Sequence, residues 1–250
     1  MTRRFGHPFV LALLAIALVV VPVAISVAGT SAANYHWARK PSHFTLEVGD
    51  NLSGNWDQLL RRTLADWNKN DTVTLDKTGG RTRPQECRPV MGRVEVCNWR
   101  YGTQKGWLGL TQLYLDRGHI EAATVQMNDS FLNAGTKYNT DAARRHTLCH
   151  ELGHTMGLDH VDTQSCMNHS QDAVFENLKP IRSDFRNLRR IYDHRDDDTT
   201  VSSASVTSEG FFDPASLPAR PSGRDTTETV TVQTLDDGRE VVTFITWAKG

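Results

Sequence analysis

The sequence carries almost no net charge, has few cysteines and contains no internal repeat. Its 250 residues include 28 Lys and Arg against 29 Asp and Glu, so the formal net charge is −1. This balance excludes a strongly basic nucleic-acid-binding protein, and we expect no nucleic acid partner. The absence of repeats excludes a solenoid or array. A chain of this length allows one or two domains.

The N-terminal segment has the order of a secretory signal. Arg3 and Arg4 precede the apolar run Phe9–Ala28, and the small residues Gly29–Ala33 follow. These are the charged, apolar and cleavage regions of a signal peptide, with cleavage after Ala33. The apolar run is long for a signal, so an uncleaved membrane anchor is the alternative. We therefore expect residues 1–33 to be removed from a secreted protein, with a membrane contact only if they are retained.

One stretch has the pattern H-E-x-x-H-x-x-G-x-x-H. On a helix, His150 and His154 lie one turn apart on the same face and can bind one Zn²⁺. Gly157 can adopt a positive φ and end the helix, so that His160 returns as the third ligand. Three protein ligands leave a fourth position for water, which is typical of a catalytic zinc site. Glu151 can reach this zinc-bound water as general base.

This extended motif resembles that of the metzincin zinc endopeptidases. The resemblance is to the short, secreted, matrixin-like or snapalysin-like bacterial type, and it implies a methionine turn after the third histidine. Met167 stands at a suitable distance from His160 and would pack beneath the histidine rings as an apolar floor. Many metzincins place a Tyr close to that turn. Here His169 follows it instead, and we name His169 as a candidate helper that would donate to the transition state.

Four cysteines in an exported protein suggest disulfides, and sequence alone allows three pairings. Proximity in the sequence favours Cys87–Cys97 and Cys149–Cys166. The second pair would tie the zinc helix to the methionine turn. An alternative is a free Cys87 thiolate that blocks zinc in a latent form, as in some metzincins, although the cysteine-switch pattern of that family is absent.

Hydrophobic periodicity outlines one domain. Apolar residues recur at helical spacing from Trp56 to Trp67, with Ser53 as the expected cap. A second helix, capped by Asn139 or Thr140, carries the zinc motif, and a last helix follows Pro180. The expected strands are His43–Val48, Thr72–Asp76, Val90–Trp99, Trp107–Leu115 and His119–Met127.

These elements predict an α+β, metzincin-like fold. It would contain a twisted mixed sheet, a packing helix, the zinc helix, a methionine turn and a C-terminal helix. The catalytic domain is expected at 34–195, followed by a Ser-, Thr- and Pro-rich flexible linker at 196–225 and a β-hairpin tail at 226–250. Two strands alone are marginal in water, so the hairpin must dock on the domain, pair with a partner or stay partly disordered.

The strand just before the zinc helix receives a role from the resemblance. Metzincins border their cleft with an antiparallel edge strand, and we assign this role to Ile120–Met127. The unpaired backbone groups of an edge strand allow an extended polypeptide substrate to add as a further strand. The expected protein is a monomer whose partner is this substrate.

Three further features have ordinary interpretations. His146 lies one turn before His150 and is read as a partly exposed structural residue, and Asp159 as a surface or loop residue. The carboxylates of Asp196–Asp198 suit Ca²⁺ but lack the ligand spacing of a calcium loop. A solvated charge run is the favoured interpretation, and one catalytic Zn²⁺ is the expected cofactor.

The sequence thus predicts a secreted zinc-dependent endopeptidase that hydrolyses peptide bonds. Two alternatives stay open. One is a zinc hydrolase of cell-wall peptides, because the motif specifies the chemistry and leaves the polymer open. The other is a non-enzymatic surface-binding module that uses the zinc fold as a scaffold, although a scaffold has no need of Glu151.

Overall fold

A computed structural model describes residues 35–170, 173–201, 217, 220 and 227–249. The expected signal peptide or anchor at 1–33 lies outside these residues, as does most of the expected linker at 196–225. Among the described helices, none combines the length and the apolar character that a membrane span requires.

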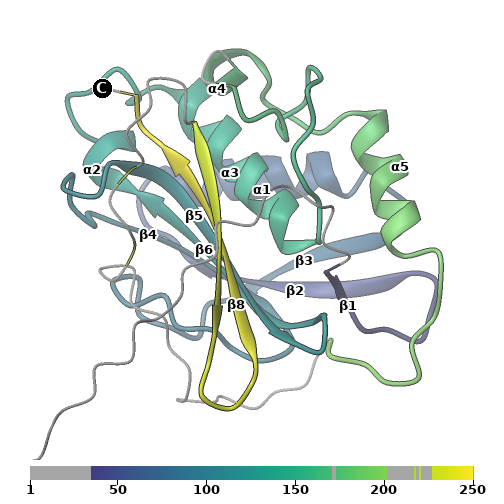
Figure 1. The fold of residues 1–250 in the computed structure, drawn as a ribbon. Helices are drawn as coiled ribbons and strands as arrows, with labels where there is room; N and C mark the ends of the chain where they lie inside the picture. The colour runs from purple at the N-terminus through teal and green to yellow at the C-terminus, as the bar shows by residue number, and fades with distance from the viewer. Residues whose placement is uncertain (1–34, 171–172, 202–216, 218–219, 221–226, 250) are drawn as a thin grey trace, which may run out of the picture.

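A mixed sheet of eight strands forms the centre of the molecule (Figure 1), as the sequence predicted in outline. The strand order is β3-β2-β4-β6-β5-β8-β7, and β1 pairs with β6. Pairing is parallel among β1, β2, β3, β4 and β6, and antiparallel from β6 through β5 and β8 to β7. The strands are β1 (His36–Trp37), β2 (Phe44–Asn51), β3 (Val73–Gly79), β4 (Val94–Trp99), β5 (Trp107–Asp116), β6 (His119–Asn128), β7 (Glu228–Thr234) and β8 (Glu240–Trp247).

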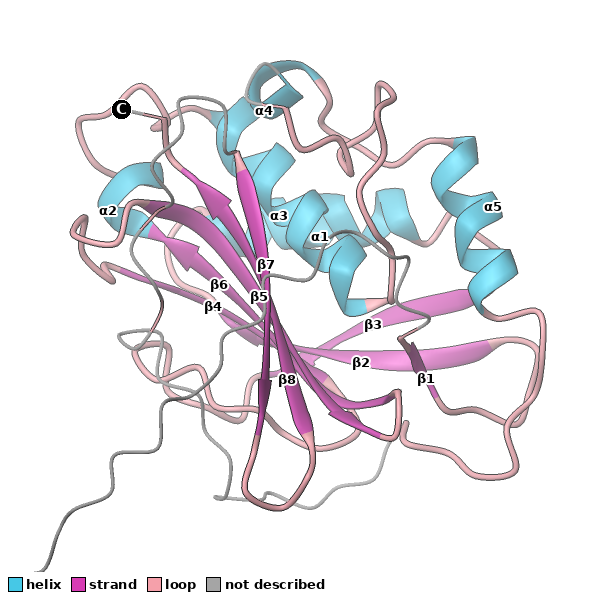
Figure 2. Ribbon diagram, in the orientation of Figure 1, coloured by secondary structure: helices cyan, strands magenta, loops and turns pink. Residues whose placement is uncertain are grey.

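The helices are α1 (Trp56–Trp67), α2 (Asp129–Leu132), α3 (Asp141–Thr155), α4 (Ala173–Glu176) and α5 (Arg182–Ile191). Figure 2 shows α1 and α3 side by side against the sheet. The face of α1 predicted from periodicity is buried. Its expected cap is wrong: Asn55 precedes the helix, and the backbone N–H of Ser53 instead donates to Asn98 Oδ1 at 2.7 Å.

Helix α3 is held inside the molecule along most of its length. Thr140 caps it, since its hydroxyl accepts the N–H of Ala143 at 3.0 Å. Two tryptophans donate to its backbone carbonyls: Trp67 to Cys149 at 3.1 Å and Trp37 to Thr155 at 2.8 Å. A buried helix with fixed ends places the side chains of its last turns accurately, and these turns carry the zinc motif.

The C-terminal hairpin, expected as a tail at 226–250, docks on the domain and extends the sheet. Strand β8 pairs with β5 from Trp107 to Leu115. The side chains of Val242, Ile245 and Trp247 are fully buried. The hairpin is therefore part of the folded core, and β7 is the last strand of the sheet on that side.

Strand β6 is not an edge strand, so the role predicted for Ile120–Met127 is wrong. β4 pairs with one side of β6 and β5 with the other. Both rows of backbone groups are already used, and no further strand can add there. The prediction failed because strand order in a sheet does not follow chain order. The antiparallel strand next to the zinc helix is β5, and β8 covers its outer edge.

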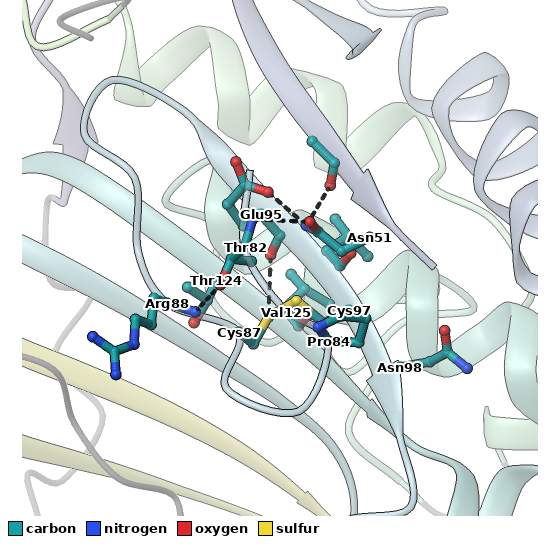
Figure 3. The surroundings of a disulfide bond; sticks show 12 residues. Asn51, Thr82, Pro84, Cys87, Arg88, Glu95, Cys97, Asn98, Thr124 and Val125 are labelled. Carbon is teal, nitrogen blue, oxygen red and sulfur yellow. Dashed lines mark hydrogen bonds between the residues drawn. A yellow bond between two sulfur atoms is a disulfide. The ribbon is translucent and has the colours of Figure 1, made fainter. Parts of the chain in front are cut away.

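Both disulfides join the cysteines that lie closest in the sequence. Cys87 is bonded to Cys97 (Figure 3), which fastens the loop before β4 onto that strand. The alternative of a free Cys87 thiolate is therefore wrong. Cys149 in α3 is bonded to Cys166, beside the methionine turn. Two disulfides are typical of proteins from an oxidising compartment.

Candidate metal centre

The three histidines of the motif converge on one point. His150 and His154 face the same side of α3, with their Nε2 atoms 3.0 Å apart. Gly157 follows the helix with a φ of 85° and turns the chain. The turn is tight, since a Cβ at Gly157 would lie 2.1 Å from the carbonyl oxygen of Tyr35. His160 then returns to the cluster, its ring centroid 5.4 Å from that of His150.

Backbone carbonyls set the orientation of two of these rings. His150 Nδ1 lies 2.7 Å from the carbonyl oxygen of Cys166, and His154 Nδ1 lies 2.8 Å from that of Leu158. A carbonyl can only accept a hydrogen bond, so Nδ1 carries the proton in both rings. In the neutral ring the lone pair is therefore on Nε2, which faces the cluster and is the atom that would bind a metal.

A fourth side chain, Glu228 at the start of β7, completes the cluster. Its Oε1 lies 3.1 Å from His150 Nε2 and 3.2 Å from His154 Nε2, and its Oε2 lies 2.6 Å from His160 Nε2. The carboxylate is almost fully buried. Sequence reasoning missed Glu228 because it stands 68 residues after His160, where no local spacing marks it.

This donor set fits zinc. Ligands bonded at about 2.0–2.1 Å in tetrahedral geometry lie about 3.3 Å from one another. The contacts between Glu228, His150 and His154 are close to that spacing. His160 Nε2 is buried and forms no hydrogen bond of acceptable geometry, even though the carboxylate is beside it. Three imidazoles and one carboxylate around a common point are a zinc-binding group in their chemistry and their placement.

Met167 packs closely against α3 and is hydrogen-bonded to the loop that carries His160. It is fully buried, and its carbonyl oxygen accepts the N–H of Val161, one residue after the third histidine. A Cβ at Gly153 would lie 2.2 Å from Met167 Sδ. Glycine at this position of α3 thus allows the methionine to approach the helix closely.

Glu151 is buried beside the cluster with both carboxylate oxygens held. Thr111 of β5 donates its hydroxyl to Oε2 at 2.6 Å, and Thr246 of β8 donates to Oε1 at 2.7 Å. Burial raises the pKa of Glu151 to about 7. A Cβ at Gly109 would lie 2.5 Å from Oε1, so this position of β5 has room only for glycine.

Burial and Glu228 act in opposite directions on the pKa values of the histidines. Burial lowers the pKa of His154 to about 4. Burial would also lower the pKa of His150, but the Glu228 carboxylate raises it to about 9. Burial opposes ionisation of Glu228 as well, yet His150 and His160 hold the pKa of Glu228 well below its usual range. The Glu228 carboxylate therefore stabilises the charged form of His150, and His150 and His160 stabilise the ionised carboxylate.

The other candidate residues are placed as follows. His146 is buried, not partly exposed: its Nδ1 contacts the carbonyl oxygen of Asn177 at 2.6 Å, and burial lowers its pKa to about 3. His169 lies beside His160, with ring centroids 5.3 Å apart. The carboxylate of Asp159 accepts the backbone N–H of His160 at 2.7 Å. Asp196 does not belong to a solvated charge run, because its side chain is only 8% exposed and contacts His36.

The chain shows little similarity to known proteins. No family model matches the chain, and no curated protein matches it. Among solved structures, it is similar to an archaemetzincin from Methanopyrus kandleri, with 14% sequence identity and a TM-score of 0.38. The match covers 61% of this chain and 97% of the archaemetzincin chain. A TM-score this low assigns no function to the chain.

Proposed function

We propose that this chain is a zinc-dependent endopeptidase. One observation carries the proposal: the Nε2 atoms of His150, His154 and His160 converge beside the buried carboxylate of Glu151. A structural zinc site requires only ligands. A buried glutamate held in a fixed position next to the ligands is the additional group that hydrolysis requires.

The chain's own residues have separable roles. When bound to the three histidines, zinc would polarise the scissile carbonyl as a Lewis acid. Glu151 would accept the proton of the attacking water and return it to the leaving amine. Thr111 fixes the direction of this carboxylate. We further propose His169 as a helper that donates to the developing oxyanion, because its ring lies beside that of His160.

The substrate that we propose is a polypeptide cleaved outside the cell by a monomeric enzyme. Export is supported by the signal-like order of residues 1–33 and by the two disulfides. Cell-wall peptides are the alternative substrate class, since the site chemistry is the same. A non-catalytic scaffold is the other alternative, and one observation supports it: Glu228 supplies a fourth donor to the cluster. Zinc sites with four protein ligands and no open position are typically structural.

Zinc content and chelator-sensitive hydrolysis test the proposal. We expect the purified protein to bind zinc in the histidine cluster and to cleave a denatured protein in a reaction that a chelator stops and added zinc restores. Cleavage of peptidoglycan fragments but not of proteins would favour the cell-wall hydrolase. Cleavage that is unaffected by removal of the metal would contradict the proposal.

A further inference from the structure

The C-terminal hairpin contacts the candidate site at three points. Glu228 of β7 lies against all three histidines. The ring of Phe244 in β8 stacks on that of His154, with centroids 4.0 Å apart. Thr246 of β8 donates a hydrogen bond to Glu151 at 2.7 Å. One supersecondary element therefore touches all three histidines through Glu228, His154 also through Phe244, and the proposed base through Thr246.

The hairpin also occupies the strand edge that borders the site. β8 runs antiparallel to β5 and pairs with it over most of its length. β5 packs directly against α3 and carries Thr111, which binds Glu151. An extended polypeptide that added to this edge would form the same backbone hydrogen bonds that β8 now forms. The hairpin and such a substrate therefore compete for one surface.

We propose that the hairpin is a built-in inhibitor, with the Glu228 carboxylate as the group that closes the fourth metal position. This inference rests on the proposed function and names its regulation. As part of the same chain, Glu228 is present at a high effective concentration and competes with any ligand from solution. Burial of the carboxylate among imidazoles adds to the advantage. Activation then requires that Glu228 leave the cluster.

A small zinc ligand measures this closure without any need for turnover. We would titrate acetohydroxamate into zinc-loaded protein by calorimetry and compare the wild type with Glu228→Ala and Glu228→Gln. Removal of the whole hairpin is unsuitable, because the fully buried Ile245 and Trp247 belong to the core. Glu240→Ala is the matched control. It removes a glutamate from the opposite end of the hairpin, where Glu240 pairs with Thr234.

We expect acetohydroxamate to bind Glu228→Ala at least tenfold more tightly than the wild type or Glu240→Ala. Cleavage of a denatured protein should rise by a similar factor. Equal affinity in the wild type and both Glu228 variants would overturn the inhibitory role, whatever the hydrolysis data show. If affinity rises but no variant hydrolyses any peptide, closure by Glu228 stands and the proposed peptidase activity is wrong.

A second group of metal-binding side chains lies elsewhere in the described part of the chain. His36 of β1 and His194 and Asp196, which follow α5, have ligand atoms that converge. The two histidine Nε2 atoms are 3.0 Å apart, the same spacing as between His150 and His154. Asp196 Oδ1 lies 3.3 Å from His36 Nε2 and 3.4 Å from His194 Nε2. His119 of β6 lies next to this group, with its Nε2 3.6 Å from the same oxygen.

The surroundings fix this group in place. Asp196 Oδ2 accepts the backbone N–H of Arg39 at 2.9 Å, which leaves Oδ1 facing the imidazoles. The side chains of Asp196 and His36 are only 8% and 13% exposed. Two imidazoles and one carboxylate suit zinc or a similar transition metal, whereas calcium prefers an all-oxygen site. We infer a second, structural zinc site that fastens the segment after α5 to β1.

Zinc stoichiometry tests this site independently of the first. Dialysis against micromolar Zn²⁺ should load two equivalents on the wild type and one on His194→Ala. His194 is the most exposed of these four residues, at 43% of its side chain, so its removal should perturb folding least. His43→Ala, outside both clusters, should keep two equivalents.

The complementary variant carries His150→Ala and His154→Ala. We expect this double variant to retain one equivalent of zinc and to lose it when His194→Ala is added. A gain in melting temperature on addition of Zn²⁺ should follow the same pattern. Zinc content that is the same in the wild type and in His194→Ala would show that the group is a hydrogen-bonded cluster without a metal.

Discussion

Replacement of Glu151 by glutamine should lower turnover about 10²–10⁴-fold, the usual range for loss of a general base, while bound zinc stays unchanged. The amide has the shape of the carboxylate but cannot take up a proton. Its environment tolerates the change, because the hydroxyls of Thr111 and Thr246 can each donate or accept. One hydroxyl can keep donating to the amide oxygen, and the other can rotate to accept from the amide nitrogen.

The measurement compares kcat and zinc content in the wild type and in Glu151→Gln. If Glu228 blocks the metal site of the wild type, kcat and zinc content are compared in Glu228→Ala with and without Glu151→Gln. The higher activity expected of Glu228→Ala makes the loss easier to measure. Glu176→Gln is the control, since it removes an exposed carboxylate from α4. Turnover that survives in Glu151→Gln would exclude Glu151 as the base.

The parts of the site that the sequence could predict are those encoded locally. His150 and His154 are one helical turn apart, so helix geometry alone brings them together. Gly157 has the positive φ that its place in the motif requires. The buried face of α1 could be predicted in the same way, because its apolar residues recur at helical spacing. In each case the interacting groups are separated by a few residues, and one backbone conformation decides their arrangement.

Glu228 could not be predicted because its position depends on long-range strand pairing. It reaches the histidines only because β7 pairs with β8, and β8 pairs with β5 in one register. A shift of one residue would turn every side chain of the strand to the opposite face. The edge role predicted for Ile120–Met127 was wrong for a similar reason. The order of strands in the sheet, in which β5 lies between β6 and β8, cannot be read from the order of strands in the chain.

The group around Asp196 shows the same limit. In the sequence, Asp196 is one of three consecutive aspartates, a pattern that favours a solvated run. Its partners His36 and His119 come from strands that precede it by 160 and 77 residues. Only the folded chain shows that one carboxylate of the run is buried among imidazoles.

Substitution of Gly157 by alanine should destabilise the protein by about 2–5 kcal/mol and weaken zinc binding at least tenfold. The left-handed conformation at φ 85° would cost an alanine about 1–2 kcal/mol. The added Cβ would also lie 2.1 Å from the backbone oxygen of Tyr35, which cannot rotate away as a side chain can. Relief of such overpacking typically costs about another 1–3 kcal/mol. The shift of the chain would displace His160, three residues later.

Gly238→Ala separates strain from overlap. Gly238 has almost the same φ, 87°, but a Cβ there would meet no atom within 4 Å. It lies in the turn between β7 and β8, away from the histidines. Denaturant unfolding should therefore show a loss of only about 1–2 kcal/mol for Gly238→Ala, with unchanged zinc affinity. Equal losses in both variants, with zinc binding intact in Gly157→Ala, would mean that the close approach to Tyr35 does not position the third ligand.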